Sequence, residues 1–117
     1  MARVVAFIPD LLFGSNVIGA LQAGGHEPVL VSSALDLEGS LPGAEVLVVD
    51  LTDDVSARIE ATQRALTDER VTVRSLAFFS HVETDVRIRA LEAGFDLVVP
   101  RSRMARAAAE LVAELAG

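Results

Sequence analysis

The sequence lacks several residue types on which whole classes of chemistry depend. It contains no cysteine, lysine, tryptophan or tyrosine, and its ten basic residues are all arginine. The absence of cysteine excludes disulfides, thiolate nucleophiles and cysteine-ligated metals, and is typical of a reducing compartment. The absence of lysine excludes Schiff-base chemistry and phosphate binding through a lysine ammonium. The two histidines, His26 and His81, are too few for a histidine-rich metal site.

Positive charge and long apolar runs are also scarce. The net charge of −7 argues against a nucleic-acid partner, because the phosphate backbone requires a basic face. No apolar run approaches the roughly 18 residues that span a bilayer. Pro9 and Asp10 interrupt the apolar start of the chain too early for a signal peptide. We therefore expect a cytoplasmic protein without nucleic-acid or membrane partners.

Aliphatic residues, by contrast, are abundant. Of the 117 residues, 51% are hydrophobic, and five phenylalanines are the only aromatic residues. A chain of this length forms one domain, here residues 1–117, with a single aliphatic core. Five short apolar runs show little alternation, as in strands that are buried on both faces. They cover residues 3–8, 28–32, 45–50, 73–80 and 96–99.

Segments with helical periodicity separate these runs. Four apolar stripes predict helices: Phe13, Val17 and Leu21; Val55, Ile59 and Leu66; Ile88, Leu91 and Phe95; and Met104, Ala108, Leu111, Val112 and Leu115. The segment 33–44 contains two glycines and a proline, so we expect a loop or one short turn and a second helix that is shortened or absent. The alternation predicts an α/β fold, a (βα)₅ doubly wound parallel five-stranded sheet with helices on both faces.

Polar residues follow four of the predicted strands. They are Asp10, Asp50, Ser80 and Arg101. In the strand order 2-1-3-4-5 the first and third strands are neighbours, so Asp10 and Asp50 should meet at the carboxyl edge, where open α/β sheets bind ligands. Arg101 and Ser102 begin the last predicted helix and could contact an anion through the helix-terminal amides. Asp53 and His81 are secondary candidates at the same edge.

Several of these residues also have a purely structural explanation. Asp10 could cap the helix that follows it. Ser80 and Ser102 could cap the helices after the fourth and fifth strands, and Thr52, Asp53 or Asp54 could cap the helix after the third strand. Because neighbouring residues of a strand point to opposite faces, Ser80 and His81 are not expected to form a catalytic dyad.

The order and spacing of these motifs resemble the receiver domain of bacterial response regulators. Residues 44–51, AEVLVVDL, resemble the third receiver strand, which ends in the phospho-accepting aspartate, here Asp50. Ser80 lies 30 residues further on, where receivers place a serine or threonine. Residues 89–96, RALEAGFD, resemble the receiver run RALEAGAD, and Arg101 takes the position of the family's lysine. The resemblance covers essentially the whole chain.

The resemblance implies roles for these residues. Asp50 would accept the phosphoryl group, Asp10 and Asp50 would hold Mg²⁺, and Ser80 and Arg101 would contact the phosphoryl group. The chain departs from the family in carrying one acid, Asp10, where receivers carry two, and an arginine in place of the lysine. The loop after Asp50 reads LTDD rather than the Met-Pro-Gly type, and the aromatic switch position of the fifth strand falls on Val98 or Val99.

These departures have an electrostatic consequence. Two carboxylates about 5 Å apart repel by roughly 3 kcal/mol at an effective dielectric constant near 20. Either a metal ion or Arg101 must offset that repulsion at Asp10 and Asp50. Arginine is permanently charged and binds carboxylates in a bidentate fork, so an Arg101 ion pair would lock the site and prevent switching.

Three functions remain open on this basis. The first is a stand-alone pseudo-receiver, not an enzyme, that acts in signalling through an unknown protein partner and dimerises through the face of the fourth helix, fifth strand and last helix. The second is a true aspartyl phospho-acceptor that uses Asp50 with Mg²⁺. The third is a protein or enzyme that binds a small anion with Asp10, Asp50, His81 and Arg101. No cofactor other than Mg²⁺ is expected.

Overall fold

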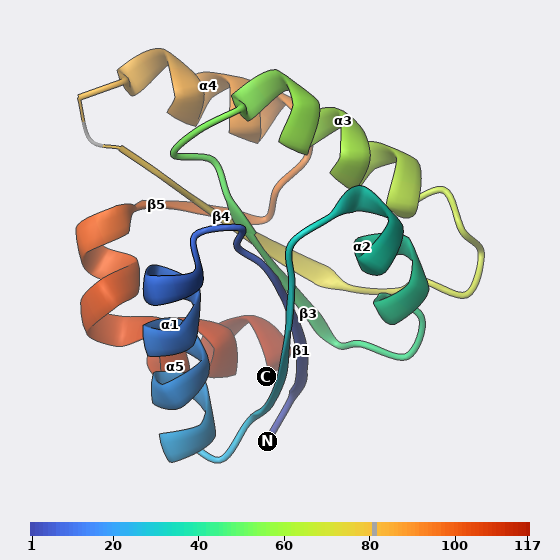
Figure 1. The fold of residues 1–117 in the computed structure, drawn as a ribbon, viewed down its shortest axis with the longest axis vertical. Coiled ribbons are helices and arrows are strands. Elements are labelled where there is room, and N and C mark those ends of the chain that lie inside the picture. Colours follow the sequence, from blue (N-terminus) through green and yellow to red (C-terminus); the bar gives the residue numbers. More distant parts are fainter. Residues whose placement is uncertain (81) are drawn as a thin grey trace.

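The computed structural model describes residues 1–80 and 82–117 and alternates strands with helices along the chain (Figure 1). The strands are β1 (Arg3–Phe7), β2 (Glu27–Val31), β3 (Val46–Asp50), β4 (Arg74–Phe79) and β5 (Leu97–Pro100). The helices are α1 (Leu11–Ala23), α2 (Ala34–Ser40), α3 (Val55–Ala65), α4 (Thr84–Glu92) and α5 (Arg101–Ala116). All strand pairs are parallel, and the order β2-β1-β3-β4-β5 confirms the predicted topology.

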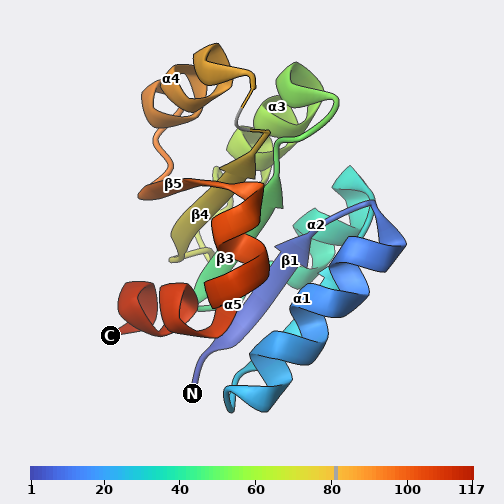
Figure 2. The same cartoon turned by 90° about the vertical axis from the view of Figure 1, so that its left-hand side faces the viewer.

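The helices cover both faces of the sheet. Figures 1 and 2 show α1 and α5 side by side on one face, with α2, α3 and α4 on the other. Successive residues of β3 alternate between the two layers of core: Val46 and Val48 pack towards α1 and α5, whereas Leu47 and Val49 pack towards the other helices. Within residues 1–80 and 82–117, no helix combines the length and apolar character that crossing a membrane would require.

The predicted apolar stripes are confirmed on the face of α1 and α5. Phe13, Val17 and Leu21 are buried in α1. The buried residues of α5 are Met104, Ala108, Leu111 and Val112. Gly24 occupies the C-cap of α1, and Gly25 follows with φ of +87°, a conformation that favours glycine.

Two predictions on the opposite face need correction. The segment 33–44 is not a loop or a single turn, because Ser33 accepts a hydrogen bond from the Asp36 amide and starts the helix α2. At seven residues α2 is the shortened second helix that was the other expectation for this segment. In α4, Ile88 and Leu91 are 57% and 44% exposed, so they are not the core stripe. The smaller pair Val86 and Ala90, one helical turn apart, faces the sheet instead.

His26 has a structural role. Its ring is buried, and Nδ1 accepts a hydrogen bond from the Ala2 amide at 3.1 Å. Nε2 lies 3.1 Å from the Ala109 carbonyl, so it carries the proton that it donates there. His26 therefore links the start of β1 to α5, just beyond the non-helical residue Ala107.

Candidate functional site

The strand register brings the predicted strand ends to one edge of the sheet. Val49 pairs with both Phe7 of β1 and Ala77 of β4, and Phe79 pairs with Pro100 of β5. The residues that follow these strands therefore lie at the carboxyl edge, as predicted.

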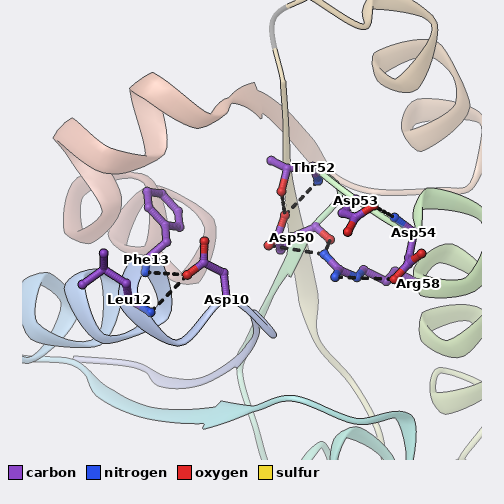
Figure 3. Close-up of polar contacts among 8 residues, drawn as sticks. All are labelled: Asp10, Leu12, Phe13, Asp50, Thr52, Asp53, Asp54 and Arg58. Carbon is purple, nitrogen blue, oxygen red and sulfur yellow. Dashed lines mark hydrogen bonds and ion pairs between the residues drawn. The ribbon is translucent and has the colours of Figure 1, made fainter.

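Asp50, the last residue of β3, is buried and every oxygen of its carboxylate has a partner (Figure 3). Oδ1 accepts hydrogen bonds from the amide of Thr52, at 2.8 Å, and from the Thr52 hydroxyl. Oδ2 lies 3.3 Å from Nη1 of Arg58, whose side chain is only 11% exposed. The same Nη1 donates to the Asp50 carbonyl at 3.1 Å. Arg58 thus neutralises Asp50 within the fold.

The loop between β3 and α3 positions this ion pair. Asp54, one of the three predicted caps, stands at the N-cap of α3 with φ of +47°, but its side chain makes no capping hydrogen bond. Its exposed carboxylate lies 4.0 Å from Nη2 of Arg58, one helical turn along α3. The Asp53 carboxylate accepts a hydrogen bond from the Asp54 amide. Arg58 is therefore flanked by one buried and one exposed aspartate.

Arg58 is not among the site residues predicted from the sequence, although the sequence holds a signal for it. Arg58 falls in the first turn of α3, where the partial positive charge of the helix disfavours a cation. Helical side chains point back towards the N-terminus of their helix, so this arginine reaches the end of β3. An arginine in the first turn after an acid-terminated strand therefore indicates an internal ion pair.

Asp10 caps α1, which confirms the structural explanation for this residue. Its Oδ1 accepts hydrogen bonds from the amides of Leu12 and Phe13, each at 3.1 Å. Figure 3 shows Asp10 directed at the start of α1, whereas Asp50 is bonded to the following loop and to α3. Among residues 1–80 and 82–117, no cluster of three or more histidine, cysteine, aspartate or glutamate side chains could hold a metal ion.

Arg101 does not pair with the acids, contrary to the hypothesis of an Arg101 lock. Its guanidinium carbon lies 4.0 Å from the centre of the Phe13 ring, a cation–π geometry. In the described part of the chain, no ion pair joins Arg101 to Asp10 or Asp50. The physical reason is position: Arg101 opens α5 on the α1 face of the sheet, whereas Arg58 approaches from α3.

The remaining candidates are peripheral to the ion pair. Neither Ser80 nor Ser102 caps a helix, because Glu83 is the N-cap of α4 and Pro100 is the N-cap of α5. Ser80 is half-buried, and its carbonyl accepts a hydrogen bond from the Glu83 amide at 2.9 Å. Ser102 is exposed within the first turn of α5. His81 lies outside the described residues.

A second short ion pair occurs away from this edge. Hydrogen bonds from Arg70, whose Nη2 lies 2.8 Å from the Asp68 carboxylate, lower the pKa of Asp68 to about 2. Both residues belong to the connection that leads from α3 into β4, so they lie at the amino edge of the sheet. This pKa shift therefore reflects an exposed turn and not the candidate site.

The fold and the carboxyl-edge site define a class of protein, the doubly wound α/β domains. No family model matches the sequence, and a search of curated proteins finds no match. Among solved structures, the receiver domain of the Francisella response regulator 1452 aligns over 99% of this chain and 97% of its own, with a TM-score of 0.82 and 13% identity. A response regulator receiver protein from Burkholderia phymatum aligns over 100% and 96%, with a TM-score of 0.80 and 22% identity.

A third similar structure is described as an atypical orphan response regulator with a phosphorylation-independent regulatory mechanism. It aligns over 97% of this chain and 94% of its own, with a TM-score of 0.76 and 15% identity. The structural similarity to these proteins establishes the architecture, whereas the low sequence identities do not establish the activity. The chain has the fold of response regulator receiver domains.

Proposed function

We propose that this chain is a pseudo-receiver, a signalling module that acts through protein partners in the cytoplasm without phosphorylation switching. The single observation that carries this proposal is the buried ion pair of Asp50 and Arg58. It occupies the position at which a receiver would hold its phospho-accepting carboxylate.

Electrostatics explains why this pair opposes phosphorylation. At 3.3 Å and an effective dielectric constant near 20, the two charges attract by about 5 kcal/mol. Phosphoryl transfer needs a free carboxylate oxygen as the nucleophile and a divalent cation to neutralise developing charge. A divalent cation bound to Asp50 would have to displace the Arg58 guanidinium, which already occupies Oδ2 of that carboxylate. Arg58 thus takes the place of Mg²⁺, and the donor set formed by Asp10 and Asp50 does not suit that ion.

The similar structures are compatible with this proposal. The protein described as an atypical orphan response regulator is regulated independently of phosphorylation. The receiver architecture is therefore able to support regulation without a phosphoryl group. In this chain the internal guanidinium would hold one conformation of the β3–α3 loop permanently.

A homodimer through the face of α4, β5 and α5 is the proposed assembly. Ile88 and Leu91 are exposed on α4 and supply apolar area for this face. The variant Ile88→Glu should shift a dimer towards the monomer in sedimentation velocity experiments. Leu12→Glu, at a still more exposed leucine on α1, is the control variant. A monomer at all concentrations would refute the homodimer.

Phosphorylation by acetyl phosphate tests the central proposal. The wild-type protein, incubated with acetyl phosphate and Mg²⁺, should show no gain of one phosphoryl group by intact mass spectrometry. Arg58→Met removes the competing cation, and Asp50→Asn removes the acceptor. A phosphoryl group on the wild type that is absent from Asp50→Asn would overturn the proposal and establish the true phospho-acceptor.

The small-anion alternative has its own test. A ligand present at a hundred times its Kd stabilises the folded state by about 2.7 kcal/mol. A thermal-shift screen followed by circular dichroism would detect such stabilisation. Because the proposed pseudo-receiver binds no small anion at this edge, phosphate, nucleotides and divalent cations should give no shift. A shift that Arg101→Met abolishes would favour the anion-binding function instead.

A further inference from the structure

We propose that the groove between α2 and α3 binds a short segment of a partner protein in which a basic side chain stands beside small apolar residues. This inference rests on the proposed function as a partner-binding module, but it assigns a surface different from the α4–β5–α5 face. The groove lies at the carboxyl edge of the sheet, next to the buried ion pair.

The shape of the groove limits its occupant. Its volume is about 290 Å³, and residues from the ends of β1 and β2 and from α3 line it. This is at the lower end of the roughly 300–1,000 Å³ of ligand pockets, so the groove accommodates one or two side chains. Because β1 and β3 are neighbours in the sheet, the groove opens where the strand order reverses, which is where open α/β sheets bind ligands.

The charge of the groove selects a cation. Arg58 lines it, but Asp50 already balances that guanidinium. Asp54 also lines the groove, and its carboxylate is 71% exposed and only 4.0 Å from Arg58 Nη2, so it adds an accessible negative charge. Asp53 precedes it with an exposed side chain. The surplus charge at this edge is negative, which attracts an arginine or lysine and repels an anion.

The apolar part of the groove fits the rest of such a segment. Pro9, Ala57 and Ala61 line it with small side chains. Ala34 lines the α2 side, and the next residue, Leu35, is 79% exposed. A small aliphatic side chain next to the basic residue would cover Leu35 and the alanines while the cation contacts Asp54.

Random heptapeptides displayed on phage and selected against the immobilised wild-type protein test the proposal. The selected sequences should carry arginine or lysine next to an aliphatic residue. Ala57→Trp fills the groove from an exposed position of α3 and should weaken the best peptide at least tenfold. Ala105→Trp, at an exposed alanine of α5, is the matched control and should leave the affinity unchanged.

The charge requirement has a separate test. Asn tolerates the left-handed conformation of Asp54, so Asp54→Asn preserves the loop. It should weaken the peptide by up to about fivefold, as expected for one partly exposed charge pair. Replacing the basic residue of the peptide with neutral citrulline should have a similar effect.

Four outcomes would overturn the proposal. The first three are selection of acidic peptides, no enrichment of peptides on the wild type relative to the Ala57→Trp variant, and equal binding of the basic peptide and its citrulline version. The fourth is a dimer that only Ala57→Trp dissociates, since a second copy of the chain would then be the occupant of the groove. None of these outcomes depends on phosphorylation. The acetyl phosphate experiment can therefore fail while this test succeeds, and the reverse.

Discussion

Breaking the ion pair of Asp50 and Arg58 should be among the most destabilising single changes in this domain. A double-mutant cycle with Asp50→Asn and Arg58→Met measures it. Both charges are almost completely removed from water, with side chains 3% and 11% exposed. Removing either partner leaves the other as an uncompensated buried charge, which typically costs about 3–5 kcal/mol.

Arg58→Met and Asp50→Asn should lose different amounts of stability. Arg58→Met leaves the Asp50 carboxylate with only the Thr52 donors and also removes the hydrogen bond to the Asp50 carbonyl. Asp50→Asn leaves Arg58 within 4.0 Å of Asp54, which partly compensates its charge. We therefore expect the larger loss for Arg58→Met. The double variant should cost about 2–3 kcal/mol less than the sum of the two.

Urea denaturation followed by far-ultraviolet circular dichroism is the appropriate assay, because the chain has no tryptophan or tyrosine for fluorescence. With a slope of about 1.5 kcal/mol/M, a loss of 3 kcal/mol lowers the midpoint by roughly 2 M. Arg64→Met is the matched control. Arg64 pairs with Glu60 on the exposed face of α3, where both side chains are more than 60% exposed. Arg64→Met should therefore lower the free energy of unfolding by less than about 1 kcal/mol.

The ion pairs Asp50–Arg58 and Glu60–Arg64 should also differ in how strongly salt weakens them. At about 1 M salt the Debye length falls to roughly 3 Å, which screens the exposed Arg64 pair but affects the buried Arg58 pair much less. Additive effects of Asp50→Asn and Arg58→Met, within about 0.5 kcal/mol, would show that the two residues do not interact and would refute the reasoning.

Four further variants test the packing and capping of helices α1 and α5, each by its urea midpoint. Gly24→Ala places a Cβ 2.5 Å from the Ala109 Cβ of α5 and should lower the free energy of unfolding by about 1–3 kcal/mol. Gly19→Ala, whose Cβ would have nothing within 4 Å, should raise it by up to about 1 kcal/mol. Equal effects of the two variants would contradict the close approach of α1 and α5 at Gly24. Arg101→Met should cost at most about 1 kcal/mol through its lost contact with Phe13, and coupling to Asp50 instead would refute this contact. Asp10→Ala should cost about 1 kcal/mol of helix capping, and a cost that appears only with Mg²⁺ present would instead make Asp10 a metal ligand.

The predictions that failed have a common cause. The stripe of Ile88 and Leu91 was read from hydrophobicity alone, but smaller residues, Val86 and Ala90, face the sheet. Side-chain size does not indicate which face of a short helix is buried when both faces carry apolar residues. The tertiary fold decides that question, because it sets how closely the helix approaches the strands.

The choice of arginine was wrong for a similar reason. Arg101 and Arg58 both follow strands that end at the same edge of the sheet, and the sequence distance to Asp50 does not distinguish them. Arg101 lies on the α1 face and is held by Phe13, whereas Arg58 points back along α3 to Asp50. Only the placement of the helices on opposite faces separates these two positions.

The amino-acid sequence by itself determined the architecture, because buried parallel strands must be continuous apolar runs and their alternation with helical segments permits few topologies. It also determined that Asp50 ends a buried strand at the carboxyl edge. The partner of that carboxylate was decided by tertiary structure alone, since a buried charge takes the nearest cation in space and not the one that a linear motif suggests.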